Sequence, residues 1–411
     1  MPNRYAIVIA VDGLRASALG AYGNTWHPTP ALDRLASESV VFDWMIADSP
    51  QLAGFYRAAW FAGDPPRDGV ERDLTSLDAA SSIASILASQ RVNLALTTDD
   101  QWLAEQADQL GFGEVRGLEI AEPTSADAVA DTELAQLFAI AADQIEYWQA
   151  AESDAAQDDA PRLLWIHARG YRGAWDAPLE LRQSLLDEED PAPAENVIPP
   201  ARLKSSDHDE LLLHRAAYAA QTIVLDECVG MLLAALEAAG IADNTLVVLV
   251  GCSGFALGEH GVAGTDALDL YSEITHVPLL VRLPGGLAPP PRMGHLAQPC
   301  DLGSILLQWF ETSEQDASSR MVVAGDDAIS AAARITAFSV GPENELALRT
   351  ASWALRRFVS QRPDGTEAPA IELFSKPDDR WEANEIADRC PEEAASLLAI
   401  AEDFLAQAAS S

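Results

Sequence analysis

Short, mostly apolar runs rich in β-branched residues recur along the chain, separated by stretches in which apolar residues return with a helical period. Runs of this length are typical of strands that are buried on both faces of a parallel sheet. We therefore predict strands at 5–11, 92–98, 162–168, 245–251 and 277–283.

Helices are predicted between these runs. The first begins where Thr29 can cap the helix and Pro30 suits its first turn. The longest covers about 210–239, with one apolar side, and Gly240 is placed to end it. Strands that alternate with helices predict an α/β sheet covered on both faces. Ligands of such sheets bind beyond the carboxyl ends of the strands, so the residues that follow each strand are the first candidates for a site.

The last part of the chain has a different pattern. Residues 335–374 hold short strand-like pieces, and 391–409 have the pattern of a closing helix. We therefore predict two parts, an α/β domain at 1–330 and a smaller α+β subdomain at 331–411.

The charge balance excludes two classes of partner. The chain has 64 acidic and 26 basic residues, for a net charge of -38. Such a field repels nucleic acid and anionic membrane surfaces, so neither is expected as a partner. Acidic stretches at 150–161 and 184–209 read as surface loops.

The cysteines and the N-terminus indicate a reducing compartment. The four cysteines lie far apart, at Cys228, Cys252, Cys300 and Cys390, with no C-x-x-C pair. In a chain of this length that spacing predicts free thiols. The first apolar run is too short for a signal sequence, and no run reaches the roughly 18 uninterrupted apolar residues that span a bilayer. The sequence therefore predicts a cytoplasmic protein.

Several motifs resemble those of the sulfatase family, in the alkaline-phosphatase superfamily. They follow the family's order and spacing at 11–15 (VDGLR), 19–24 (LGAYGN), 57–63 (RAAWFAG), 257–261 (LGEHG) and 276–285 (HVPLLVRLPG). The resemblance covers almost the whole chain. It implies a large mixed, mostly parallel sheet covered by helices on both faces, with a smaller C-terminal α+β subdomain. It also implies hydrolysis of sulfate esters by a Ca²⁺-bound formylglycine, made from the first residue of a C/S-x-P-x-R motif.

The chain departs from this motif at its nucleophile. Arg57 matches the arginine of the motif, which places Ala53 at the nucleophile position and Phe55 where the proline belongs. An alanine methyl group has no lone pair with which to attack sulfur. The stretch 50–56 contains neither Cys nor Ser, so shifting the match by a residue or two does not restore the nucleophile.

The metal ligands of the family are also mostly replaced. Asp12 matches one aspartate after the first strand, but Gly13 follows it, and Cys252 and Ser253 stand where the second ligand pair belongs. The family's mid-chain histidine aligns with Arg172. Ca²⁺ needs about six to eight oxygen ligands, and one carboxylate beside a soft thiol does not supply them. We therefore expect no cofactor, with Asp12 only a remnant of the metal site.

The remaining matches also fit structural roles. Asp12 can accept backbone hydrogen bonds at the edge of the sheet, and Arg57 can pair with one of the many acidic side chains. His260 fits its family motif, but a histidine without a recognised partner rarely catalyses, so we expect it to pack beside Tyr271 and not to act as a base. Cys252 could serve as a nucleophile only if a neighbour lowered the pKa of its thiol.

Three interpretations follow. We favour a catalytically silent sulfatase-like protein, a pseudoenzyme with a binding or regulatory role toward a protein partner or a small anionic ligand. The first alternative is a hydrolase of sulfate or phosphate esters with a rebuilt site around Asp12, Arg57, Cys252 and His260, which would need Ca²⁺. The second is a structural or assembly protein that uses the acidic loops as contact surfaces.

Overall fold

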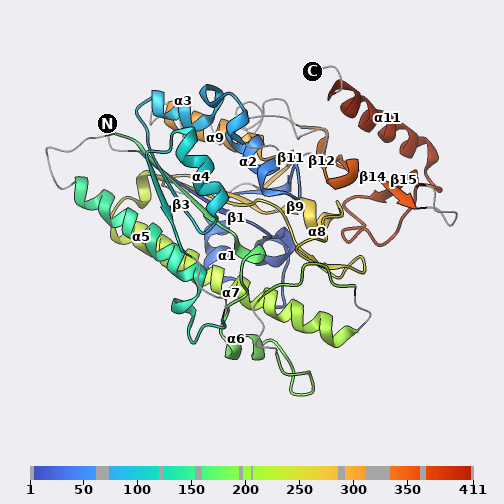
Figure 1. Cartoon of the computed structure of the whole chain (residues 1–411), viewed down its shortest axis with the longest axis horizontal. Helices are drawn as coiled ribbons and strands as arrows, with labels where there is room; N and C mark the ends of the chain where they lie inside the picture. Colours follow the sequence, from blue (N-terminus) through green and yellow to red (C-terminus); the bar gives the residue numbers. More distant parts are fainter. Residues whose placement is uncertain are drawn as a thin grey trace.

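The computed structural model describes residues 4–61, 74–119, 124–152, 160–193, 198–204, 207–285, 292–311, 334–361 and 367–408. A large central sheet lies between two layers of helices, and a smaller sheet with the C-terminal helix lies beside it (Figure 1). The predicted boundary between 330 and 331 falls outside the described residues.

The described residues form nine strands of the central sheet: β1 (Tyr5–Val11), β2 (Val40–Ile46), β3 (Asn93–Thr98), β4 (Glu114–Gly117), β5 (Arg162–Ala168), β6 (Thr245–Gly251), β9 (His276–Val277), β10 (Leu279–Arg282) and β11 (Arg292–Ala297). Their order is β11-β2-β10-β6-β1-β5-β3-β4, and β9 pairs with β2. β1 runs parallel to β5 and β6, and β3 runs parallel to β5 and β4. The prediction of a mixed, mostly parallel sheet is confirmed.

The prediction of a parallel strand at 277–283 is wrong. This stretch holds two short strands, β9 and β10, and β10 runs antiparallel to both β6 and β2. The chain leaves β6 at the carboxyl edge of the sheet and stays there until β9, without the long crossover that a parallel neighbour needs. It therefore has to run back along β6.

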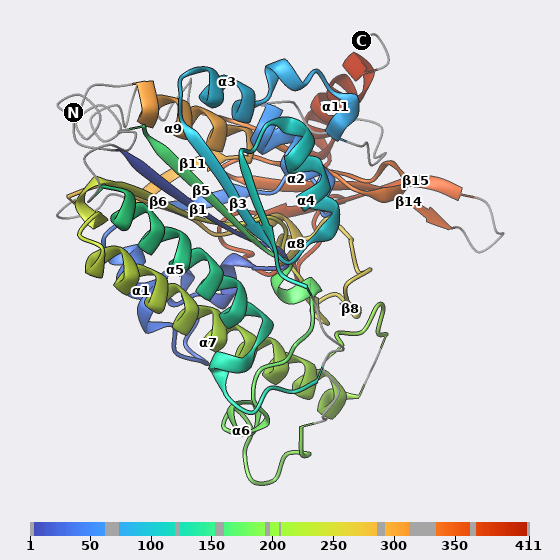
Figure 2. The ribbon, with the colours of Figure 1, turned by 60° about the vertical axis from the view of Figure 1, so that its left-hand side comes forward.

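Side chains of the central strands alternate between two apolar layers. Ile7, Ile9 and Val11 face a layer that contains α1 (Pro30–Ser37), α5 (Glu133–Glu152) and α7 (His208–Ala238). Ala6, Val8 and Ala10 face the layer of α2 (Leu52–Phe61), α3 (Ile83–Ser89), α4 (Gln101–Leu110) and α9 (Cys300–Glu311). Figure 2 shows the two layers on opposite sides of the strands. Burial on both faces explains why the strand sequences are almost wholly apolar.

The first helix has a different cap from the one predicted. Thr29 precedes α1, but its hydroxyl accepts from Gly20 N–H at 3.1 Å instead of capping the helix. The carboxylate of Asp226 on α7 accepts from the N–H groups of Ala31 and Leu32 at 3.2 and 2.8 Å. A cap from another helix ties α1 to α7, and no local pattern could predict it.

The longest helix, α7, is a core helix. By length and composition it could cross a membrane, but 67% of its most apolar stretch is buried inside the protein. Gly240 follows it with φ +71°, as the predicted end of the helix requires. The predicted loop at 150–161 begins inside α5, and 153–159 lie outside the described residues.

The C-terminal unit is a four-stranded antiparallel sheet backed by one helix. Its strands are β12 (Ala337–Val340), β13 (Leu346–Arg349), β14 (Trp353–Gln361) and β15 (Glu367–Ser375), in that order. Leu397 and Ala401 of α11 (Pro391–Ala408) pack on Leu348 and Leu373 of this sheet. The predicted smaller α+β unit with a closing helix is confirmed.

The remaining elements are short. They are β7 (Ala256–Leu257), β8 (Ala263–Gly264), α6 (Leu179–Gln183), α8 (Ser272–Thr275), and the 3₁₀ helices η1 (Ala16–Ala18), η2 (Gly20–Tyr22), η3 (Leu74–Ser76), η4 (Ala79–Ser81), η5 (Val129–Asp131), η6 (Gly170–Arg172), η7 (Ala242–Asn244) and η8 (Pro342–Asn344).

Candidate functional site

The carboxyl ends of β1, β5 and β6 bring three predicted site residues together. Asp12 directly follows β1, Arg172 lies in η6 just after β5, and Ser253 is the second residue after β6. Parallel neighbouring strands end at one edge of the sheet, so residues 80 or more positions apart in the sequence meet there. We call Asp12, Arg172 and Ser253 the Arg172 cluster.

One carboxylate oxygen of Asp12 is the centre of this cluster. It accepts from the Ser253 hydroxyl at 2.7 Å and from the Gly13 N–H at 2.9 Å. Nε of Arg172 lies 3.4 Å from the same oxygen, and Nη2 of Arg172 donates to the Ser253 hydroxyl at 3.2 Å. A guanidinium group thus lies against the aspartate that the resemblance matches to a metal ligand.

Backbone carbonyl groups fix the position of Arg172. Nη1 donates to the Thr265 carbonyl at 2.5 Å, and Nη2 lies 3.4 and 3.5 Å from the carbonyl oxygens of Gly254 and Pro50. These acceptors are neutral and come from three separate segments. The side chain is therefore held in place while its charge faces a single carboxylate.

Burial governs the ionisation of Asp12, which is only 4% exposed. Burial raises the pKa of the Asp12 carboxyl group. The charge of Arg172 and the hydrogen bonds from Ser253 and Gly13 lower that pKa, but by less. The net shift of the Asp12 pKa is upward, and Arg172 is the largest of the effects that oppose it.

The nucleophile position lies in a packed helix. Ala53 is buried on α2, and Phe55, Tyr56 and Trp60 of the same helix are buried as well. The Tyr56 hydroxyl accepts from the indole N–H of Trp165 at 3.1 Å. Aromatic side chains therefore fill the region around Ala53. Arg57, partly exposed, lies one turn after Ala53 on α2.

Cys252 does not have the properties of a nucleophile. Its backbone N–H donates to the Val11 carbonyl at 2.9 Å, and its side chain is buried. Burial and the nearby charge of Asp12 raise the pKa of the thiol well above its ordinary value. A thiol in this state stays protonated, which removes the nucleophile from the rebuilt-site alternative.

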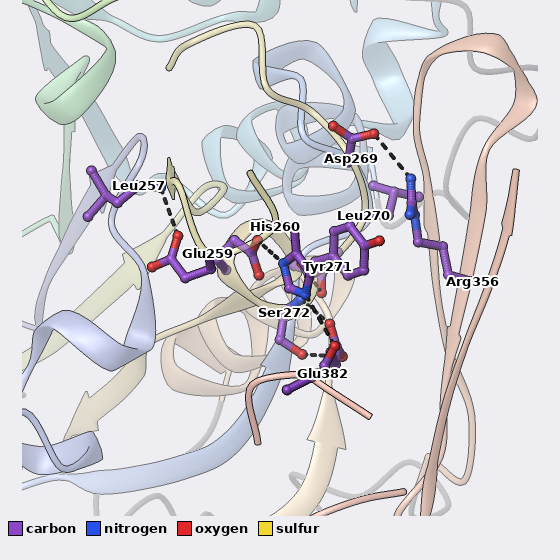
Figure 3. A network of polar contacts seen from close by, with 12 residues as sticks. Leu257, Glu259, His260, Asp269, Leu270, Tyr271, Ser272, Arg356 and Glu382 are labelled. Carbon is purple, nitrogen blue, oxygen red and sulfur yellow. Dashed lines mark hydrogen bonds and ion pairs between the residues drawn. The ribbon is translucent and has the colours of Figure 1, made fainter. Parts of the chain in front are cut away.

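His260 belongs to a different network, shown in Figure 3. Its ring stacks on Tyr271, with 3.5 Å between centroids and 2° between planes, so packing beside Tyr271 is confirmed. Nδ1 lies 2.6 Å from a carboxylate oxygen of Glu273, and Nε2 lies 3.2 Å from the carbonyl oxygen of Glu382. Both partners are acceptors, so both ring nitrogens carry hydrogen, as in an imidazolium ion.

The direction of the pKa shift of His260 agrees with a protonated ring. Burial lowers the pKa of the ring, but the hydrogen bond and charge of Glu273, helped by Glu382, raise the pKa further, and the net shift is upward. His260 thus links the 257–276 segment to the C-terminal unit. The structure does not bring it together with the Arg172 cluster through any contact of the described residues.

A cleft beside the Arg172 cluster contains residues that the sequence did not single out. Its volume is about 390 Å³, and its lining includes Glu133, Arg169, Arg172, Ile198 and Thr265. Arg169 is the first residue after β5, where the carboxyl-end rule places ligands, so the signal was present in the sequence.

A second cleft adjoins the first, because Arg169 lines both. It has a volume of about 870 Å³ and lies at the carboxyl ends of β3 and β4. Its lining includes the acidic residues Asp99, Asp100 and Glu119 and the aromatic residue Trp102. Arg169 thus lines one cleft with three acidic residues and another cleft with Arg172 and Glu133.

The donor atoms at the family's metal position do not fit Ca²⁺. They amount to the carboxylate of Asp12, the hydroxyl of Ser253 and the protonated thiol of Cys252, and the guanidinium of Arg172 lies among them. Ca²⁺ takes about six to eight oxygen ligands. In the described part of the chain no group of three or more His, Cys, Asp or Glu side chains could hold a metal ion.

The fold and the placement of these residues at its carboxyl edge define an alkaline-phosphatase-like α/β protein. Residues 4–313 match the family model described as Sulfatase. The chain therefore belongs to the sulfatase family.

Known proteins similar to the chain support this assignment. An ulvan-active sulfatase of Formosa agariphila is 24% identical over 298 residues, which are 68% of this chain and 56% of that protein. The chain thus spans little more than half of that relative, and the other curated relatives align over shorter stretches.

Solved structures show the same fold. A protein of Bacteroides fragilis classed as a sulfatase has a TM-score of 0.72 at 18% identity, with 99% of this chain and 96% of that chain covered. The phosphonate monoester hydrolase of Agrobacterium radiobacter has a TM-score of 0.69 at 16% identity, with 100% and 96% covered. Both parts of the chain thus have counterparts in these structures.

Proposed function

We propose that this chain is a non-catalytic member of the sulfatase family that keeps the scaffold for binding. One observation carries the proposal: the guanidinium of Arg172 lies on Asp12 and Ser253, at the place where the resemblance puts a metal ion. A fixed internal cation there balances the Asp12 carboxylate without a metal.

The nucleophile position supports the same conclusion independently. Ala53 is 2% exposed within α2 and has no reactive atom. Loss of the nucleophile alone could leave a site that still binds metal, and loss of the metal ligands alone could leave an idle nucleophile. Both are replaced here, so the family reaction has neither of its two main components. No cofactor is proposed.

The alternatives have less support. A rebuilt ester hydrolase needs an activated nucleophile, yet the Cys252 thiol is buried and protonated and His260 is engaged with Glu273. An assembly role would use the acidic stretches 150–161 and 184–209, and no contact of the described residues favours it. The net charge of -38 continues to disfavour nucleic acid and anionic membranes as partners.

The test is turnover of 4-nitrophenyl sulfate by the full chain in the presence of Ca²⁺, followed as release of nitrophenolate. We expect no release above the rate in buffer, even at high protein concentration. Metal-dependent release that disappears in an Arg57→Ala variant would contradict the proposal, because it would require a working family site.

A further inference from the structure

We infer that a cleft at the amino ends of β3, β4 and β5 binds an uncharged planar heterocycle with a hydrogen-bond donor and an acceptor side by side on one edge, as in adenine. The cleft has a volume of about 360 Å³, and its lining includes the residues that begin these strands, Asn93, Glu114 and Arg162. This volume lies within the usual range for small-molecule sites. The Arg172 cluster lies at the opposite, carboxyl edge of the sheet, so the inference does not rest on the proposed function.

Helix α5 supplies the second wall of this cleft. Gln144, Tyr147 and Trp148 all line it, and their spacing of three and four positions places them on one side of α5. Ala95 of β3 lines the strand wall and belongs to the same apolar layer as Trp148. Figure 2 shows α5 beside the strands, in the layer that also contains α7. A ligand in the cleft therefore lies between a strand wall and a helix wall.

Gln144 carries the inference, because its side chain is buried and its oxygen has no partner. The residue is 2% exposed, and its Oε1 accepts no hydrogen bond within the described ranges. A buried polar atom without a partner is costly, so native proteins normally pair such an atom with protein, water or a ligand. A ligand in the cleft that Gln144 lines can complete these hydrogen bonds. An amide presents an acceptor and a donor side by side, which match the adjacent donor and acceptor of adenine.

Tyr147 gives the cleft a flat apolar surface. It is 58% exposed, and aromatic side chains of this kind stack on the flat faces of nucleobases. A planar ring has two apolar faces, which suit a cleft with Ala95 on one wall and Tyr147 on the other. The hydroxyl groups of a sugar would lose water against the same apolar walls without gaining partners there. The walls therefore favour a planar heterocycle over a polyol.

The charges in the lining balance, so the ligand should be neutral. Among the lining residues Glu114 is acidic and Arg162 is basic. Glu114 lies 2.6 Å from Arg116 in an ion pair, and Nη1 of Arg162 donates to the Trp148 carbonyl at 3.3 Å. The protein as a whole carries a net charge of -38, which repels a phosphate group. The site should therefore prefer a free base or a nucleoside to the corresponding nucleotide.

Equilibrium dialysis of the full chain at pH 8 tests the inference with three related probes and one sugar. Adenosine is neutral and carries the 6-amino donor, purine riboside lacks that amino group, and adenosine monophosphate is a dianion at this pH. We expect saturable binding of adenosine and at least tenfold weaker binding of purine riboside and of adenosine monophosphate. Glucose should show no measurable binding.

Two variants locate the site. Gln144→Leu removes the amide at similar volume and should weaken adenosine binding at least tenfold, and Tyr147→Ala removes the stacking surface and should weaken it at least fivefold. Gln136→Leu is the matched control: it makes the same change at an exposed residue of α5 that donates to the Asp131 carbonyl at 3.0 Å. It should change binding less than twofold. Gln144→Leu should melt at no lower temperature than the unaltered chain, because the buried oxygen that it removes has no partner.

Several outcomes would overturn the inference. They are no saturable binding of adenosine, tighter binding of adenosine monophosphate or of glucose, and equal losses in Gln144→Leu and Gln136→Leu. A clearly lower melting temperature of Gln144→Leu would also overturn it, because the amide would then serve the packing of α5. The proposed function is tested separately, by turnover of 4-nitrophenyl sulfate, and stands or falls independently of this cleft.

Discussion

Two arginines of this protein, the buried Arg356 and the half-buried Arg172, have opposite surroundings. Arg356 on β14 meets three carboxylates: it pairs closely with Glu345, and it lies 3.0 Å from Glu372 and 3.1 Å from Asp269. Arg172 at the edge of the central sheet meets one carboxylate at 3.4 Å and otherwise neutral oxygens.

The difference distinguishes a structural cross-link, at Arg356, from the candidate functional site, at Arg172. Arg356 also lies 4.2 Å from the ring centroid of Tyr271, which stacks on His260, so its contacts join the 257–276 segment to the C-terminal sheet. We call Arg356, Tyr271, His260, Glu273 and Glu382 the latch. Three carboxylates surround Arg356, whereas Arg172 meets only one. Arg172 and Asp12 instead form a matched pair of one positive and one negative charge.

The largest loss of stability is expected from removing Arg356, the arginine that meets three carboxylates. Arg356→Leu leaves three carboxylates near one another without their cation, and loss of one partner of a buried pair typically costs about 3–5 kcal/mol. Urea unfolding should show a loss of this size. Arg34→Ala, at an exposed ion pair, should cost below about 1 kcal/mol. Equal losses in the two variants would remove the distinction between latch and surface pair.

Removing Arg172 should cost less free energy of unfolding, and this cost should depend on pH. Arg172→Met strands a single carboxylate, Asp12, which can take up a proton, so we expect a loss of about 1–3 kcal/mol. The folded-state pKa of Asp12 is already raised by burial and would rise further, so stability should be kept at low pH and lost as pH rises.

A second substitution checks the cause. Asp12→Asn in the Arg172→Met background removes the stranded charge, so the double variant should recover stability at pH 8 and lose the added pH dependence. A double variant as unstable as Arg172→Met at pH 8 would show that packing, and not the Asp12 charge, explains the loss.

The latch should respond to pH in the opposite sense to an ordinary carboxylate pair. The folded-state pKa of His260 is raised by Glu273, so its contribution is fully present below about pH 6.5, the ordinary value, and is lost as pH rises through the folded value. His260→Gln should flatten the fall in unfolding free energy between pH 6.5 and 9. An unchanged slope would show that the ring is neutral in the folded protein.

The smallest effect is expected from restoring the nucleophile alone. Ala53→Cys adds one sulfur atom to a buried position, which should cost about 1–2 kcal/mol by overpacking and should give no turnover of 4-nitrophenyl sulfate. The donor atoms around Asp12 would still not fit Ca²⁺. Turnover by Ala53→Cys would mean that the metal position works.

The sequence predicted most of the central sheet, because apolar runs depend on local pattern, whereas the departures from the family's site stay predictions. The strands β1, β3, β5 and β6 match their predicted ranges within a residue, and Ala53 and Arg172 were located by motif spacing alone. Contacts between distant segments left no such pattern. The docking of Arg172 on Asp12, the Glu273 partner of His260 and the Asp226 cap of α1 join residues far apart in the chain or from different elements.

Two failures have specific physical causes. The antiparallel β10 has the same apolar composition as a parallel strand, because it is buried on both faces, so its direction could not be read from it. Arg169 belongs to no motif: its place directly after β5 was its signal in the sequence, and the two clefts that it lines distinguish it in the structure.

The central claim is that Arg172 stands in place of the family's metal ion. Metal analysis of the purified protein, combined with thermal melting during a Ca²⁺ titration, tests it most directly. We predict no stoichiometric metal and no change in melting temperature up to millimolar Ca²⁺. One bound metal per chain, with the stabilisation of about 2.7 kcal/mol that a ligand gives at 100 times its Kd, would contradict the claim.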